Sequence, residues 1–126
     1  MKKFVCVVVI LAISMAMLTT VSYAAEPRWN NVASISPSIS ALDGCYTCAI
    51  AGLSGTTKIN CTMILYEKTW LGTYKEVSRT SEVYNDRMHE FVGYYAIREG
   101  THYKLDITAI VTCNGSDETV SCTFEK

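Results

Sequence analysis

The side chains in this sequence best suited to covalent or metal chemistry are thiols and imidazoles. Cys45 and Cys48 form a Cys-x-x-Cys motif, which in redox proteins begins a helix beside a βαβ unit. This motif lies instead in a segment that alternates like a β-strand, so we do not expect redox activity. A zinc site would need reduced thiols clustered with His89 or His102, and a second ligand pair at zinc-finger spacing is missing from the sequence.

Enzymatic use of a cysteine is the remaining chemical hypothesis. Cys45 could act as a nucleophile with His89 or His102 as its base, but both histidines fall where surface residues are expected. The alternating serines of residues 34–40 lack a Gly-x-Ser-x-Gly elbow, and no glycine-rich phosphate loop or EF-hand spacing occurs. We therefore expect no enzyme activity, catalytic residue, cofactor or metal. A small cysteine-dependent enzyme is the least favoured alternative.

Aromatic side chains are the candidates for binding. Trp29 precedes the first expected strand, and Trp70 lies in a turn. Tyr74 and Tyr84 fall on or near faces away from the expected core. Such rings stack on sugars or anchor protein interfaces, and they can equally cap the open ends of a β-sandwich. The sequence thus predicts either structural packing or contact with an extracellular protein or glycan.

The chain that carries these residues is expected to be secreted, because its N-terminus has the three regions of a signal peptide. Lys2 and Lys3 supply the charged start, residues 4–18 the apolar run, and Ser22-Tyr23-Ala24 the cleavage site. We expect residues 1–24 to form a signal-peptide helix that is cleaved off, which leaves no stable membrane anchor. An uncleaved anchor is the alternative, since the apolar segment is almost long enough to span a bilayer.

Residues 25–126 are expected to form a single β-sandwich domain. Their number, 102 of the 126 residues, suits one domain with one core. Removal of Lys2 and Lys3 lowers the count of basic residues from 11 to 9 against 12 acidic ones, so the net charge of the mature chain is about −3. Because the sequence shows no basic patch or stripe, we expect no nucleic-acid partner.

The pattern of the mature chain is that of short antiparallel strands. Apolar residues recur at spacing two, and turn residues interrupt them about every ten residues. Pro37 fits an edge strand, and the polar stretch that ends at Tyr84-Asn85-Asp86 looks like another sheet edge. Seven strands in a chain of this length favour two packed sheets over one open sheet. They are expected near residues 32–39, 46–50, 59–68, 74–77, 89–97, 103–111 and 120–124.

The last hairpin fixes one register. If Asn114-Gly115 is a two-residue loop, Cys122 lies opposite Ile107. A four-residue loop through Asp117 would place Cys122 opposite Ala109 instead. In both cases Cys122 lies away from Cys113, so these two cysteines are not expected to pair.

Five cysteines in an oxidising compartment predict two disulfides and one leftover thiol. Cys45 and Cys48 are three residues apart on a strand and point to opposite faces, so they pair poorly with each other. Cys48 with Cys122 is our first choice, on facing sheets. Cys61 would then pair with Cys113 on a neighbouring strand, although Cys113 lies nearer its turn than Cys61 does. Cys45 would remain as a free thiol that could join two copies into a homodimer.

The segment Gly100-Thr101-His102-Tyr103 resembles the corner before the sixth strand of fibronectin type III domains. The resemblance implies an immunoglobulin-like sandwich in which the Tyr103 hydroxyl bonds to upstream backbone. The chain departs from that family in lacking a core tryptophan on its second strand and in its cysteine content. It departs from antibody domains because Leu105 stands where their second cysteine would be.

The mature chain also resembles small secreted proteins of Gram-positive bacteria that have no assigned function. The shared segments are Pro27 to Trp29, Gly55 to Thr57 and Leu65-Tyr66. This resemblance implies the fold and the compartment only. From all these observations we expect a non-catalytic extracellular binding or interaction module. The alternative is a structural or self-assembling protein linked through Cys45 or an edge strand.

Overall fold

The computed structural model of the chain describes residues 29–126, so the predicted signal segment 1–24 lies outside the described residues. The described residues contain no helix long and apolar enough to cross a membrane. They form an all-β structure, as the alternating pattern predicts. The seven strands are β1 (Val32–Ser40), β2 (Cys45–Gly52), β3 (Thr56–Lys68), β4 (Tyr74–Tyr84), β5 (Met88–Tyr94), β6 (Tyr103–Cys113) and β7 (Ser116–Glu125).

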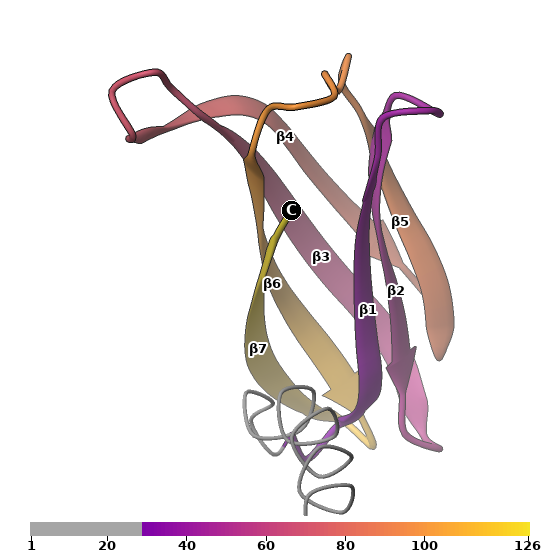
Figure 1. Ribbon diagram of the computed structural model, residues 1–126. Coiled ribbons are helices and arrows are strands. Elements are labelled where there is room, and N and C mark those ends of the chain that lie inside the picture. The colour runs from indigo at the N-terminus through magenta and orange to yellow at the C-terminus, as the bar shows by residue number, and fades with distance from the viewer. Residues whose placement is uncertain (1–28) are drawn as a thin grey trace, which may run out of the picture.

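The strands form two antiparallel sheets that face each other (Figure 1). One sheet has the order β1-β2-β5, and the other has the order β4-β3-β6-β7. The edge position predicted from Pro37 is confirmed, because β1 pairs only with β2, where Pro37 lies opposite Cys48. An edge strand tolerates proline since the missing N–H need not pair on the open side.

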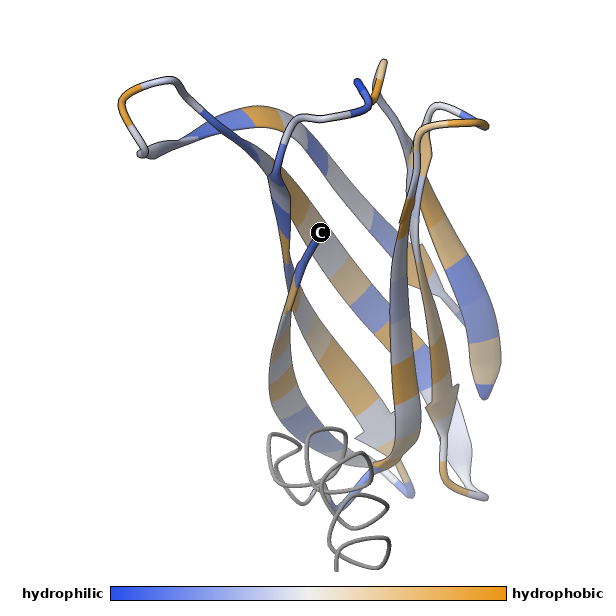
Figure 2. Cartoon of the chain, viewed as in Figure 1, coloured by the Kyte–Doolittle hydropathy of each residue, from blue (hydrophilic) through white to orange (hydrophobic). Residues whose placement is uncertain are grey.

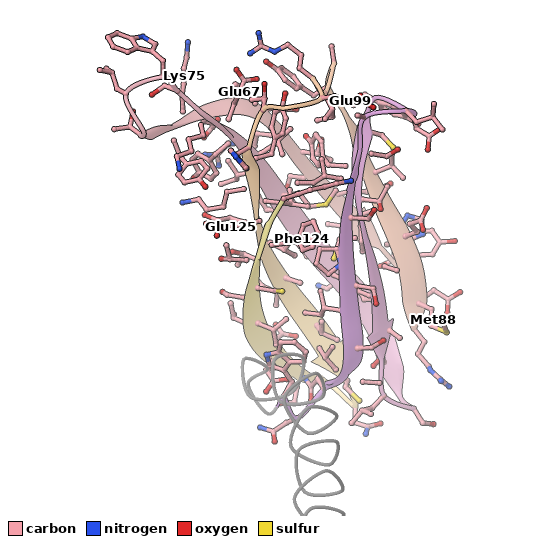
Figure 3. All side chains as sticks on the ribbon, in the orientation of Figure 1. Glu67, Lys75, Met88, Glu99, Phe124 and Glu125 are labelled. Carbon is pink, nitrogen blue, oxygen red and sulfur yellow. The ribbon has the colours of Figure 1, made fainter. Side chains whose placement is uncertain are left out.

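One hydrophobic core fills the space between the sheets. Every second residue of a strand points inward, as the alternating bands of Figure 2 illustrate. Half-buried Phe124 packs against this core from β7 (Figure 3). The largest fully buried side chains are Tyr46, Tyr103, Phe91, Ile39, Ile50, Ile59, Met63, Leu65, Leu105, Ile107, Val111 and Val120.

Strand lengths differ from the predictions at β4 and β5. The expected short strand near residues 74–77 continues to Tyr84, because the polar stretch pairs along β3 and, as an edge strand, needs no second apolar face. Strand β5 ends at Tyr94, so Ile97 lies in the loop that follows it. The two-residue hairpin loop is confirmed, because Cys122 lies opposite Ile107. Asn114 and Gly115 both have positive φ there, as a type I′ turn requires.

Tyr46 connects the two sheets through its side chain. Its ring lies across Gly93 of β5, where an added Cβ atom would be 2.1 Å from the Tyr46 Cζ. The hydroxyl then reaches β4, with 2.6 Å to the Ser78 hydroxyl oxygen and 3.2 Å to that of Thr80. The absence of a side chain at Gly93 therefore permits this hydrogen-bonded link between the sheets.

Candidate functional site

The buried thiols of Cys48 and Cys61 are poor nucleophiles. Burial raises the pKa of Cys48, and nearby Cys61 and Cys122 raise it further. Burial also raises the pKa of Cys61 to about 12, with a smaller contribution from the Glu82 carboxylate. A thiol with a raised pKa carries almost no thiolate at neutral pH, and the thiolate is the nucleophile. Neither Cys48 nor Cys61 is thus suited to nucleophilic catalysis.

The structure separates one of the two predicted disulfide pairs. Along β3 and β6, Cys61 lies opposite Ala109, whereas Cys113 lies opposite Thr56. The four-residue offset corresponds to about 13 Å along the strands, and a disulfide spans Cα atoms only about 7 Å apart or less. The Cys61–Cys113 prediction is incompatible with this register. No disulfide bond occurs within residues 29–126.

The thiol of Cys45 and the imidazole of His89 are also held apart. Cys45 is half-buried at one end of β2, opposite Ser40 and Tyr94. His89 lies opposite Ile50, five residues farther along β2, which is about 17 Å. No group of three or more histidine, cysteine or acidic side chains in the described part of the chain is placed to hold a metal ion.

The four aromatic candidates occupy three different places. Trp29 is half-buried and packs against the core. Tyr84 stacks on His89, with ring centroids 3.7 Å apart, at one end of β4. Trp70 and Tyr74 lie together at the opposite end, in and beside the turn between β3 and β4. The structure therefore brings Trp70 and Tyr74 together but not Trp29 or Tyr84.

The turn of residues 69–73, which we call the hairpin tip, presents a large apolar surface to solvent. Trp70 is 92% exposed, and its neighbour Leu71 is 67% exposed. Leu71 was not among the predicted binding residues, although an apolar Trp-Leu pair is unusual where turns favour glycine and small polar residues. Figure 2 shows this tip projecting from the sandwich, with one short hydrophobic band on the loop. Exposed apolar side chains grouped in this way mark contact sites.

Hydrogen bonds hold the hairpin tip in one conformation. The Thr69 N–H donates to the Thr73 carbonyl over 2.7 Å, and the Gly72 N–H donates to the Thr69 carbonyl over 2.9 Å. The Thr69 and Thr73 hydroxyl oxygens are 2.9 Å apart. Gly72 has a φ of 87°, a backbone conformation that residues other than glycine rarely adopt. Trp70 is thus displayed on an ordered turn.

A β-bulge directs the hairpin tip away from the core. In the pairing of β3 with β4, Leu65 faces Ser78 but Tyr66 faces Glu76, so Val77 is the extra residue. A bulge bends its strand and increases the local twist. Figure 1 shows the β3–β4 connection extending well beyond the rest of the sandwich.

The bases of the loops at this end are tied together. The Tyr95 N–H donates to the Gly44 carbonyl over 3.2 Å, which joins the β1–β2 turn to the β5–β6 loop. The Lys68 N–H donates to the His102 carbonyl over 2.9 Å, which joins the hairpin to the same loop. Within that loop, the Arg98 N–H donates to the Tyr103 hydroxyl over 2.9 Å, the kind of contact expected of a corner tyrosine.

Two shallow hollows flank these loops. One of about 430 Å³ is lined mainly by the β5–β6 loop, and one of about 290 Å³ lies at the base of the hairpin beside Lys68, Tyr74 and His102. A search with protein-family models finds no matching family, and a search of curated proteins finds no match to this chain.

Proposed function

We propose that this chain is a secreted, non-catalytic β-sandwich module that binds an extracellular partner through the hairpin tip. The observation that carries the proposal is the exposure of Trp70 and Leu71 on a turn whose backbone is already hydrogen-bonded. A folded protein gains nothing in stability from a tryptophan that remains in water. Such a ring gains free energy when a partner covers it.

The fold supports a resemblance to extracellular sandwich domains. Strand β4 pairs with β3, whereas in constant-type immunoglobulin domains the fourth strand pairs with the fifth. The pairing of β4 with β3 favours the fibronectin type III alternative, and the Tyr103–Arg98 hydrogen bond is the corner contact that both kinds of domain share. Secretion and the resemblance to Gram-positive secreted proteins belong to the same proposal and rest on the sequence.

The ordered tip lowers the entropy cost of binding. A mobile loop would lose conformational freedom when a partner orders it. Here the bonds between Thr69 and Thr73 have already fixed the turn. Buried tryptophans are common among the residues that contribute about 2 kcal/mol or more to an interface. We therefore expect Trp70 to supply a large part of the binding free energy.

The test is binding of labelled protein to an array that carries extracellular proteins, glycans and phospholipids. We expect the wild type to bind at least one class and Trp70→Ala to weaken that binding at least about tenfold. Tyr94→Ala is the matched control, because Tyr94 is 76% exposed but lies on β5, in the other sheet from the hairpin. Equal binding by the wild type and Trp70→Ala would overturn the proposal.

Self-association is a second candidate, favoured by the edge strand β7, which Asn30 and Asn31 contact only near its start, at Ser116 and Glu118. This ten-residue strand has no proline, lysine or bulge, and such edges pair with other strands. Asp117, Glu118 and Glu125 oppose that pairing between two copies, because their charges would meet. Non-reducing mass analysis tests the covalent form: a dimer that disappears in Cys45→Ser would favour this candidate over the first.

A further inference from the structure

The charge around the hairpin tip is positive, although the chain as a whole is acidic. Residues 68–75 contain Lys68 and Lys75 and no acidic side chain. The carboxylates that flank this segment are both engaged by arginines. Glu67 forms an ion pair with Arg98, and Glu76 forms one with Arg79 at 2.9 Å. Although Glu67 also lies opposite Lys75, the four basic residues Lys68, Lys75, Arg79 and Arg98 outnumber the two carboxylates, which leaves a net charge of about +2 around the tip.

Figure 3 shows the position of Lys75 at the projecting hairpin, with Glu67 nearer the body of the sandwich. On the face of the sheet opposite to that of Lys75 and Glu67, the Lys104 Nζ lies 4.7 Å from the centroid of the Tyr74 ring. Lys104 lies opposite Glu125 in the register of β6 and β7, and Lys75 lies opposite Glu67 in the register of β3 and β4. Lys68 and Lys75 are the lysines within the hairpin segment itself.

The combination of side chains matches the interface between a membrane and water. Tryptophan is enriched at that level because its ring is apolar while its N–H can stay hydrated. Leu71 supplies a second side chain that can enter the acyl boundary. Lysines that flank such a tip extend their stems along the apolar region and place their charges among lipid phosphates.

The shape of the tip argues against a protein as the main partner. The tip is a narrow projection (Figure 1), whereas a stable protein interface needs about 800 Å² on each side. The hollow at the hairpin base is lined by Lys68 and His102 together with the Glu125 carboxylate, which disfavours a bound phosphate, and by Tyr74 and Tyr103. Exposed Leu42, at 94%, lies on another loop at the same end, yet Asp43 follows it directly. Anionic lipid would therefore favour the hairpin over that loop.

From these observations we infer that the hairpin tip inserts Trp70 and Leu71 into the headgroup region of an anionic phospholipid membrane. Lys68 and Lys75 contact the phosphates beside them. This inference rests on the proposed function and names its partner. The contact is reversible, because two apolar side chains and two charges give far less affinity than a membrane-spanning helix.

The test is co-sedimentation of the full mature protein with phosphatidylcholine vesicles that contain about one-third phosphatidylglycerol, or none. We expect binding to the anionic vesicles and at least about tenfold weaker binding to the neutral ones. Trp70→Ala should reduce anionic binding at least about tenfold. Replacement of Lys68 and Lys75 by glutamine should reduce it about fivefold for each lysine. Tyr94→Ala should bind like the wild type.

Two results would overturn the inference. One is the absence of sedimentation with either vesicle, and the other is equal sedimentation of the wild type and Trp70→Ala. If the protein does not sediment with vesicles but Trp70→Ala abolishes its binding to an arrayed protein or glycan, the lipid partner is wrong and the proposed binding function stands. If binding to vesicles and to the array are both independent of Trp70, both proposals are wrong.

Because Trp70 is exposed, the urea midpoint of Trp70→Ala should match that of the wild type, which confirms a folded variant.

Discussion

Gly93→Ala should destabilise the fold because it places a methyl group where the Tyr46 ring lies. The added Cβ atom would be 2.1 Å from Tyr46 Cζ and 2.4 Å from its hydroxyl oxygen. The Tyr46 side chain is completely buried. It cannot move aside without giving up the 2.6 Å contact with Ser78.

The size of the effect follows from two contributions. Overpacking a filled core costs about 1–3 kcal/mol, and loss of the hydrogen bond between Tyr46 and Ser78 adds about 1 kcal/mol. We therefore expect Gly93→Ala to lower the free energy of unfolding by about 2–4 kcal/mol. Because small domains have urea m-values of about 1–3 kcal/mol per molar, the midpoint of urea unfolding should fall by about 1 M or more.

A double-mutant cycle identifies the cause. Tyr46→Leu replaces the ring with a shorter side chain. In that background Gly93→Ala should lower the free energy of unfolding much less than it does in the wild type, with a coupling energy of about 1–3 kcal/mol. Two results would refute the reasoning. One is a midpoint for Gly93→Ala that is unchanged from the wild type. The other is additivity of the two substitutions, which would show that Tyr46 is not the obstacle.

Three further predictions concern the thiols and the corner. After oxidation by a small disulfide, peptide mapping should find Cys48 joined to Cys122, the pair expected from the sequence. Both Cys61 and Cys122 lie near enough to raise the pKa of Cys48, so a Cys48–Cys61 peptide would contradict this choice, and a Cys61–Cys113 peptide would contradict the register. In reductant, the domain should keep its full stability below pH 9.0, the ordinary pKa of a thiol, and should lose stability as the pH rises toward 12. Burial raises the pKa of Cys48 and Cys61 in the folded chain, so over that range only the unfolded chain releases those protons. The expected loss is about 1 kcal/mol per pH unit for each thiol, measured by urea unfolding. Tyr103→Phe should lower thermal stability by about 1 kcal/mol through loss of the Arg98 contact, and an unchanged midpoint would exclude that role for the hydroxyl.

Much of the fold could be predicted from local patterns. Alternation at spacing two predicts which strand residues lie inward because side chains on a strand point to opposite faces in turn. Asn114-Gly115 fixes the β6–β7 register through turn geometry, and the resulting Cys122–Ile107 pair is present. Pro37 similarly indicated an edge strand. These features depend on residues that are close in the sequence.

The features that escaped prediction depend on contacts between distant segments. The offset of Cys113 from Cys61 is set by the register of β3 and β6, strands that no short turn connects. The bulge at Val77 is likewise set by how β4 lies along β3. Trp70 was recognised as a candidate, but its separation from Trp29 follows from the projection of the hairpin, which the sequence alone does not show.

Trp70 fluorescence gives the most direct test of the central claim that the hairpin tip is the binding surface. The chain has two tryptophans, so Trp29→Phe leaves Trp70 as the only indole reporter. In water the emission should be that of an exposed indole, since Trp70 is 92% exposed. Anionic vesicles should shift the emission to shorter wavelength and protect it from acrylamide, because the ring leaves water. Binding to those vesicles with no change in Trp70 emission or quenching would contradict the claim.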